Sequence, residues 1–526
     1  MATEQQSSLV ESLLRPEAYP DQVSDVELVE TYISYLFLTG RYAYKVKRPV
    51  DYGFLDFTTL EKRRYYCHQE VELNRRLSPE VYLGVVEIRE QNGQYTIDGP
   101  GQTVEYAVKM LQLPRHRAMN ALLRDGEVSE GNIRRLAYRI ADFHSHAETS
   151  PEIGRLGGLE VVRQNVEENF SQTEKFVGVC LSSDAFDDLV AYSRAFLEAK
   201  ENLFQRRARE GRIRDCHGDL HSAQIFLENG ISIIDCIEFN DRFRCSDVAE
   251  DIAFLAMDLD YHHRPDLSQL FIETYVRESN DSGVLDLLSF FKSYRAYVRG
   301  KVASFRLDDP ALTDEEKEET LASAQAYFEL AHSYTRVFPR AVIVLIVGIT
   351  GTGKSTVAQE LARRWNFSYI SSDITRKGLA GIAPEEHQYE SFGEGIYSPE
   401  FSRQTYDAMF QRAEQYLQDG RSVVLDGTFR NTAERSRAIE IARRARVDVW
   451  IIECSLPEEE VRRRLERRSQ EGTSASDAGW ELFHLLQQEW EPVAEVPSNR
   501  YLRLDTSGSL SETMRNLLSQ LYACVV

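Results

Sequence analysis

The sequence predicts a two-domain protein, with an N-terminal α+β domain followed by a C-terminal α/β domain built on a parallel sheet. The chain of 526 residues is longer than one ordinary hydrophobic core can serve. In its last third, apolar β-branched strands alternate with amphipathic helices, which is typical of a parallel sheet covered on both faces. In the earlier part, strands gather first and helices follow, which indicates a small β-rich lobe and a larger helical lobe.

The N-terminal elements follow this order. Residues 30–110 carry most of the predicted strands, together with one strong helix at about 59–77. Helices are predicted at 131–148 and 183–207, and two strands flank a turn at 225–235.

The boundary between the domains is expected at about residue 335, which gives domains 1–335 and 336–526. An amphipathic helix is predicted at 314–334, and the apolar run 341–347 then begins a new buried strand. Each domain is expected to fold alone, because each carries its own core pattern.

The C-terminal domain continues as a regular alternation of strands and helices, and such sheets bind ligands beyond the carboxyl ends of their strands. The predicted strands lie at 341–347, 367–372, 422–426, 447–453 and 500–504. The predicted helices lie at about 354–365, 399–418, 432–445 and 457–469, with a final helix after the last strand.

A glycine-rich loop, Gly348-Ile-Thr-Gly-Thr-Gly353-Lys354-Ser355, joins the first of these strands to the first helix. Its backbone N–H groups can form a nest for phosphates, with Lys354 reaching the β- and γ-phosphates and Ser355 binding Mg²⁺. The sequence therefore predicts Mg-ATP as the ligand. The remaining nucleotide-binding candidates in this loop are Gly348, Thr350, Gly351, Thr352, Gly353 and Thr356.

Two later strands end in acidic residues at the same edge of the sheet. Asp426 can hold Mg²⁺ through water, or simply belong to a strand-end turn. Asp373 can accept the proton of an acceptor hydroxyl while Arg376 binds a phosphate; the alternative is that the segment only begins a helix.

The helix predicted at 457–469 is rich in arginine. Such a run is usually a solvated face, but one or two of its members, with Arg463 and Arg467 as candidates, can close over the phosphates as a lid.

Together these motifs resemble the small P-loop kinases of the AAA_33 and zeta-toxin type, over about residues 340–526. That group includes gluconate kinase-like, chloramphenicol phosphotransferase-like and polynucleotide 5′-kinase domains. The resemblance implies phosphoryl transfer and leaves the acceptor open.

The N-terminal domain carries a second acidic motif, Cys216-His-Gly-Asp219-Leu-His221, followed at a strand end by Asp235. Asp219 on a tight loop can accept a hydroxyl proton, and Asp235 can bind Mg²⁺. The motif resembles the catalytic loop of the aminoglycoside phosphotransferase branch of the protein-kinase-like fold. Where that family has a metal-binding Asn, this chain has Gln224, whose extra methylene shifts the carbonyl oxygen.

The same resemblance implies a strand lysine that holds the α- and β-phosphates and pairs with a helix glutamate. Because side chains alternate along a strand, Lys45 and Lys47, two positions apart, lie on one strand face. Glu70 lies on the helix 59–77. The sequence does not choose between the lysines, and two lysines on an edge strand is the alternative. Asp247 and Asp251 are expected to be structural, by capping a helix or pairing with Arg242 or Arg244.

Composition excludes some classes of partner. A formal net charge of −22 disfavours a broad nucleic-acid surface. No apolar run approaches the length of a membrane helix, and no secretory signal is visible. Seven dispersed cysteines suggest reduced thiols, so we expect a cytoplasmic protein.

The whole chain resembles bifunctional proteins that join an aminoglycoside phosphotransferase-like domain to an ATP-binding domain. The leading hypothesis is a tandem kinase that transfers the γ-phosphoryl of Mg-ATP to the hydroxyl of a small molecule or a nucleic-acid end. One alternative is a 5′-hydroxyl RNA kinase with an accessory kinase-like domain. The other is a nucleotide-sensing or toxin–antitoxin-like module with one inactive site, which Gln224 favours.

Overall fold

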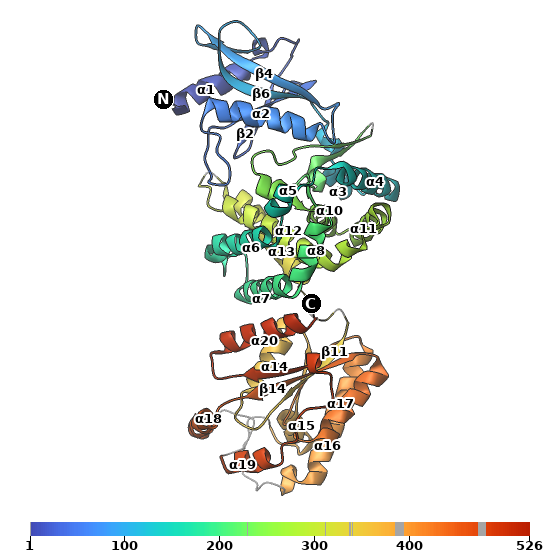
Figure 1. The fold of residues 1–526 in the computed structure, drawn as a ribbon. Coiled ribbons are helices and arrows are strands. Elements are labelled where there is room, and N and C mark those ends of the chain that lie inside the picture. The colour runs from blue at the N-terminus through green and yellow to red at the C-terminus, as the bar shows by residue number, and fades with distance from the viewer. Residues whose placement is uncertain are drawn as a thin grey trace. The chain divides into compact units, whose positions relative to one another are not determined.

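The structure is a computed structural model that describes residues 2–228, 230–310, 312–335, 338, 340–383, 394–471 and 480–525. The chain divides into two compact units (Figure 1). The first unit comprises Met1–Leu181 and Lys200–Tyr334, and the second comprises Ser182–Ala199 and Thr335–Val526. Among the described residues, no helix is both long enough and apolar enough to cross a membrane.

The first unit begins with a six-stranded antiparallel sheet in the order β1-β2-β3-β6-β4-β5. Its strands are β1 (Glu27–Glu30), β2 (Ser34–Leu38), β3 (Tyr42–Lys47), β4 (Tyr82–Gln91), β5 (Gln94–Ile97) and β6 (Gln102–Leu111). Helix α1 (Ala2–Leu13) precedes the sheet, and α2 (Leu60–Asn74) packs against β4 and β6. Thr59 caps α2 by accepting a hydrogen bond from the N–H of Lys62.

The rest of the first unit is helical, and α10 (Val248–Tyr261) is its buried centre, packed against α11 (Pro265–Ser279) and α12 (Leu285–Arg306). Two short antiparallel pairs of strands precede α10 in the chain, β7 (Ile213–Asp215) with β10 (Cys245–Asp247) and β8 (Ile225–Leu227) with β9 (Ile231–Ile233). The loop 216–224, which carries Asp219, lies between β7 and β8 in the chain. The other elements are α3 (Met119–Arg124), α4 (Glu130–His146), α5 (Pro151–Leu156), α6 (Leu159–Thr173), α8 (Glu201–Arg209), α9 (Asp241–Arg244) and α13 (Asp314–Ser333).

The second unit contains a parallel sheet, as the sequence predicted. The structure describes five strands in it, in the order β12-β13-β11-β14-β15. Its strands are β11 (Val342–Val347), β12 (Ser368–Ser371), β13 (Val423–Asp426), β14 (Asp448–Ser455) and β15 (Tyr501–Asp505). Helices α14 (Lys354–Trp365) and α20 (Leu510–Val525) pack together beside the sheet, while α16 (Pro399–Gln418) packs against α17 (Thr432–Ala445). Every residue of β11 is buried, which explains its continuous apolar run.

Two helices of the second unit were not predicted from the sequence. They are α15 (Ser372–Leu379) and α19 (Trp480–Gln488), and α18 (Glu458–Glu471) lies between α19 and β14 in the chain. Both are short, and α15 carries too few apolar residues for its helical period to stand out.

Helix α7 (Ser183–Ala199) corrects the predicted domain organisation. It precedes α8 in the chain, where one helical segment was expected, yet it belongs to the second unit and packs against α20. The rings of Tyr192 and Tyr522 meet edge to face at 5.2 Å. The buried carboxylate of Asp188 pairs with Arg364 of α14 at 3.2 Å. Periodicity shows that a helix forms, but it does not show which sheet the helix covers.

Candidate active sites in the two units

The glycine-rich loop of the second unit runs from the end of β11 to the start of α14. Gly348, Gly351 and Gly353 have φ values of +136°, +80° and +83°, which side-chain-bearing residues rarely adopt. A Cβ at Gly351 would lie 2.8 Å from Cγ1 of Val461, so space as well as conformation requires glycine there. The loop therefore exposes backbone N–H groups at a helix N-terminus, as anion binding requires.

Several hydrogen bonds hold this loop in shape. The Thr352 hydroxyl and the Lys354 ammonium donate to the carbonyl of Ile349, at 2.8 and 2.9 Å. Thr506, just after β15, donates from its hydroxyl to the carbonyl of Thr352 at 2.8 Å. The loop is thus anchored at its centre, and Lys354 lies along it.

Asp426 ends β13, beside β11, and is 2% exposed. The Tyr369 hydroxyl donates to its Oδ2 at 2.7 Å. Burial raises the pKa of Asp426, although the charge of Lys354 and a hydrogen bond from Ser355 act in the opposite direction. A hydroxyl and a carboxylate lying together are the hard oxygen ligands that Mg²⁺ prefers, so Ser355 and Asp426 fit the predicted metal position.

Asp373 and Arg376 lie on α15, which Ser371 caps by accepting from the N–H of Ile374. Asp373 is partly exposed in the first turn, and its negative charge acts on Asp426. Arg376 is buried, and it donates to the carbonyl of Ile396 at 2.6 Å and to the Ser402 hydroxyl at 3.0 Å. These contacts join α15 to the start of α16, so phosphate binding by Arg376 stays a prediction.

Helix α18 covers the glycine-rich loop with Val461 and Leu465, which are buried and lie one turn apart. Arg463 points elsewhere: its side chain is 69% exposed and pairs with Glu460. Arg464 instead donates to the carbonyl of Thr506 at 2.5 Å.

Among the α18 arginines whose side chains the structure describes, Arg464 lies at the loop, because its Nη1 would be 3.3 Å from a Cβ at Gly353. The sequence predicted that some arginine of this helix serves as a lid, but the candidates singled out were Arg463 and Arg467. The signal was present in the spacing of Arg464 from Val461 and Leu465, which places Arg464 on the same helix face. Arg467 is exposed.

A pocket of about 480 Å³ opens beside the turn between β15 and α20, next to Thr506. It is lined by Asp505, Ser507, Gly508, Glu512, Thr513, Arg515 and Asn516.

The acidic loop of the first unit, residues 216–224, brings Asp219 close to Asp235, which follows β9. The Gln224 amide nitrogen lies 3.4 Å from Oδ2 of Asp219 and 3.2 Å from Oδ2 of Asp235. Asp235 has φ +64°, and its backbone N–H donates to the hydroxyl of Tyr82 at 3.1 Å. The three residues that the sequence singled out for acid–base and metal chemistry are therefore neighbours.

The carboxylate of Asp219 is ionised at neutral pH. Burial opposes ionisation, but the charge and hydrogen bond of His221, at 3.3 Å, and the charge of Arg299 hold the pKa of Asp219 below its usual range.

The two strand lysines differ in their surroundings. Lys45 pairs with Asp235 at 2.5 Å and with Glu70 at 2.9 Å, and its side chain is 15% exposed. Lys47 pairs with Glu70 at 2.7 Å and with Glu238, and only 1% of its side chain is exposed. Although burial raises the pKa of Glu70, the two lysines lower it to about 2, so Glu70 is a carboxylate between two ammonium groups.

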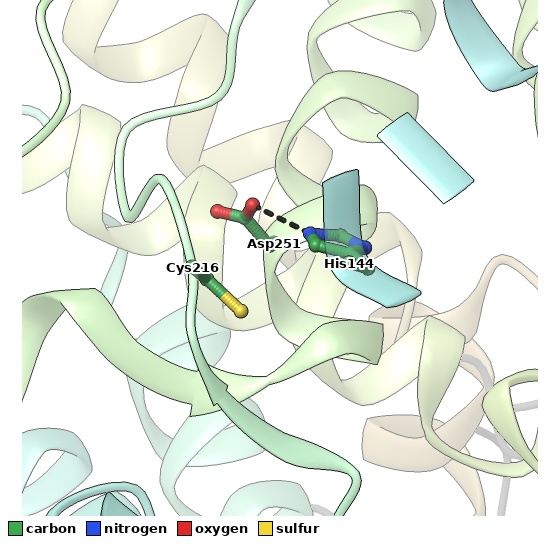
Figure 2. Close-up of side chains that lie close together, drawn as sticks. All are labelled: His144, Cys216 and Asp251. Carbon is green, nitrogen blue, oxygen red and sulfur yellow. Dashed lines mark hydrogen bonds and ion pairs between the residues drawn. The ribbon is translucent and has the colours of Figure 1, made fainter. Parts of the chain in front are cut away.

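Asp251 of α10 holds the acidic loop in place through hydrogen bonds. Its carboxylate accepts the backbone N–H groups of His217 and Gly218, at 3.2 and 2.8 Å, and a hydrogen bond from His144 at 3.1 Å (Figure 2). Burial would raise the pKa of Asp251, but His144 and these neighbours lower it to about 2. Asp251 makes structural contacts, but it holds the loop and His144 instead of capping a helix or pairing with an arginine, as was predicted.

His144, Cys216 and Asp251 have metal-ligating atoms within 4.8 Å of one another, and all three are buried. His144 also bonds the Tyr275 hydroxyl at 2.8 Å, and the Cys216 thiol donates to the carbonyl of Ser246 at 3.5 Å. Burial raises the pKa of the Cys216 thiol well above its usual range, so it is a poor ligand. The group forms a satisfied network without an ion.

Asp247 caps a helix, which was one of its two predicted roles, but its ion-pair partner is not one of the predicted arginines. It caps α10 by accepting from the N–H of Ala249 at 2.8 Å. Its ion pair is with the buried Arg207, at 2.7 Å, whereas Arg244 pairs with Asp215 and Asp241.

The loop between β11 and α14 defines the second unit as a P-loop nucleotide-binding domain of the kinase-like type. Residues 343–493 match the family of AAA domains designated AAA_33. The chain is 30% identical over 431 residues to Uncharacterized protein Rv2004c of Mycobacterium tuberculosis, covering 82% of this chain and 84% of that protein. Uncharacterized protein Mb2027c of Mycobacterium bovis matches equally. The chain belongs to the family that contains these mycobacterial proteins.

Two solved structures match part of the chain. A gluconokinase from Sinorhizobium meliloti is 20% identical, covers 36% of this chain and 95% of its own, and has a TM-score of 0.26. A choline/ethanolamine kinase family protein from Mesorhizobium loti is 11% identical, covers 64% of this chain and 99% of its own, and has a TM-score of 0.38.

Proposed function

We propose that this protein is an ATP-dependent phosphotransferase with one ATP site in each unit, and that each site transfers the γ-phosphoryl group to an acceptor hydroxyl. The observation that carries the proposal is the P-loop of the second unit, with Ser355 and Asp426 lying together at its end. A triphosphate and its metal are held by four kinds of group: a nest of backbone N–H groups, a lysine, a hydroxyl and a carboxylate. The P-loop, Lys354, Ser355 and Asp426 supply them here.

In the second unit, the loop N–H groups and Lys354 bind the phosphates, and Arg464 adds a cation from α18. The pocket beside Thr506 is our candidate position for the nucleoside part of ATP, because Thr506 is hydrogen-bonded to Thr352 of this loop. Ser355 and Asp426 would hold Mg²⁺, which supplies charge neutralisation at the transferred phosphoryl group. Asp373 orients the acceptor hydroxyl and takes its proton.

In the first unit, Lys45 binds the nucleotide phosphates, and the ion pair with Glu70 positions the Lys45 side chain. Asp235 and the amide oxygen of Gln224 would hold the metal, because the side-chain amide can turn either its nitrogen or its oxygen toward Asp235. Asp219 faces the acceptor. The transfer forms a bond from the acceptor oxygen to the γ-phosphorus, breaks the bond to the β–γ bridging oxygen, and moves the hydroxyl proton to Asp219.

One observation favours a second candidate function for the first unit. The Gln224 amide nitrogen bonds both Asp219 and Asp235, so it occupies the space where metal and acceptor would meet. A first unit that binds nucleotide without transferring phosphoryl groups, and so acts as a sensor for the second, fits this arrangement.

The experiment that tests the proposal uses the full chain with γ-labelled ATP and a panel of sugars, nucleosides, aminoglycosides and 5′-hydroxyl RNA. Lys354→Ala and Asp219→Asn should each lose part of the label transfer of wild type and keep the rest, because each substitution silences one site. Complete loss in Lys354→Ala, with no change in Asp219→Asn, would favour the sensor. Absence of ATP turnover and of ATP binding in wild type would contradict the proposal.

A further inference from the structure

We propose that the acceptor of the first unit carries a negatively charged group, a carboxylate or a phosphate ester, which Arg299 binds. The proposal rests on the proposed function of this unit and names the chemical class of its substrate. Its evidence is the surroundings of Asp219 on the side formed by α10, α12 and α13.

Arg299 lies on α12, one helical turn beyond Arg295. Arg295 donates from its guanidinium to the carbonyl of Gly218 at 2.9 Å, so this face of α12 is turned toward the loop that carries Asp219. The charge of Asp219 is one of those that raise the pKa of Arg299, in agreement with this placement.

Aromatic rings hold Arg299 in place. Its guanidinium lies over the ring of Tyr327, 5.4 Å from the centroid. Tyr327 stacks in turn on Tyr261 of α10, at 3.9 Å and 6° between the ring planes. A partly buried guanidinium fixed on a ring is pre-organised to bind an anion, since it loses little freedom on binding.

The two arginines of this face differ in their ion pairs. Arg295 pairs with Glu250 at 2.9 Å. Within the part of the chain that the structure describes, no carboxylate forms an ion pair with Arg299. The charges of Asp219 and Asp258 act on Arg299, but neither carboxylate forms an ion pair with it, so its guanidinium can pair with an anion beside the residue that faces the acceptor.

Two neighbouring carboxylates of α10 already have partners, since the charge of Asp258 also acts on Arg299, and this disfavours a cationic acceptor. Asp258 accepts the backbone N–H of Ser222 at 2.8 Å. Asp260 pairs with Lys292 at 2.6 Å and accepts a hydrogen bond from the Tyr334 hydroxyl at 2.5 Å. A polyamine sugar such as an aminoglycoside needs carboxylates that are not engaged in this way, because each ammonium group has to be paired when it leaves water.

The test compares probes that share one carbon skeleton and differ in charge. D-gluconate, D-glucose and D-glucosamine, together with glucose 6-phosphate and inorganic phosphate, are titrated calorimetrically into the full-length Lys354→Ala protein with Mg-ADP present. This background weakens the second ATP site. We expect the anionic probes to bind more tightly than glucose and glucosamine.

Arg299→Gln should weaken binding of the anionic probes by about 10- to 100-fold, the range for a hydrogen bond to a charged group. Arg299→Lys should restore part of that loss, and Arg306→Gln, an exposed arginine further along α12, should change nothing. Mg-ADP affinity should be equal in all these variants.

Three results would overturn the inference. These are the absence of any Arg299-dependent binding of the anionic probes at millimolar concentration, tighter binding of glucosamine than of gluconate, or an Arg299→Gln protein that loses Mg-ADP affinity instead. The proposed function fails separately, because it requires Mg-ADP to bind the first unit whatever the acceptor. An intact nucleotide site with a neutral or cationic acceptor would refute only the anionic class.

Discussion

Lys45 donates a hydrogen bond of 2.5 Å to Asp235, which lies 190 residues further along the chain. The same ammonium group meets Glu70 at 2.9 Å. Lys47, two residues on, shares Glu70 but is enclosed with Glu238. Lys45 therefore connects the antiparallel sheet to the acidic site, whereas Lys47 neutralises buried carboxylates.

The first prediction separates the two lysines. Lys45→Met should weaken Mg-ATP binding to the first unit by about 10- to 100-fold, because it removes a phosphate ligand, with little change in melting temperature. Lys47→Met should cost about 3–5 kcal/mol of stability, because Glu70 and Glu238 lose a buried counter-ion. Calorimetric titration and urea unfolding measure these effects. Equal losses of affinity and stability in the two variants would contradict the assignment.

The second prediction concerns two adjacent arginines of α18. Arg464→Ala should lower kcat/KM for ATP at the second site by at least about tenfold, since Arg464 adds a cation from α18 next to Gly353. Arg463→Ala is the matched control, and it should have almost no effect because its exposed pair with Glu460 is worth little. Steady-state ATP turnover of both variants checks this. A larger effect in the Arg463 variant would show that the lid closes through the other face.

A third prediction follows from Asp251, whose folded pKa of about 2 lies below the ordinary value. A depressed carboxyl pKa stabilises the fold above the unfolded pKa of about 3.9, and this contribution disappears as the pH falls through 2. The difference in unfolding free energy between wild type and Asp251→Asn should therefore shrink by about 2–3 kcal/mol between pH 5 and pH 2. Urea unfolding at a series of pH values measures it. A difference that does not depend on pH would show that Asp251 is not ionised against His144 and the loop.

The fourth prediction tests the place of α7. A fragment 335–526 should melt at a lower temperature than the same fragment with residues 182–199 joined to it by a flexible linker. Without α7, α20 exposes Tyr522, and Arg364 loses its buried partner Asp188. In the full chain, Tyr192→Ala should cost about 3–5 kcal/mol, as for other large aromatic truncations. Identical melting of both fragments would show that α7 adds nothing to the second unit.

The sequence predicted the parts of the structure that rest on local patterns. The buried run of β11, the positive-φ glycines and the period of α14, α16 and α17 are properties of neighbouring residues, and α14, α16 and α17 begin and end where they were expected. The joint position of Asp219, Gln224 and Asp235 also followed from a short motif with a strand pair between its members.

What the sequence could not show depends on contacts between distant residues. The different surroundings of Lys45 and Lys47 depend on Asp235 and Glu238, which lie on another part of the chain. The assignment of α7 to the second unit depends on α20, more than 300 positions away. The sequence could not distinguish Arg464 from the other arginines of α18, because they carry the same charge. The packing of α18 on Gly351 is what shows which helix face meets the loop.

The most direct test of the central claim is the number of ATP sites, counted by calorimetric titration of the full chain with a non-hydrolysable ATP analogue and Mg²⁺. We predict two sites in wild type, one in Lys354→Ala, one in Lys45→Met, and none in the double variant. A wild-type chain that binds one equivalent, which Lys354→Ala abolishes and Lys45→Met leaves unchanged, would contradict the claim that both units bind ATP.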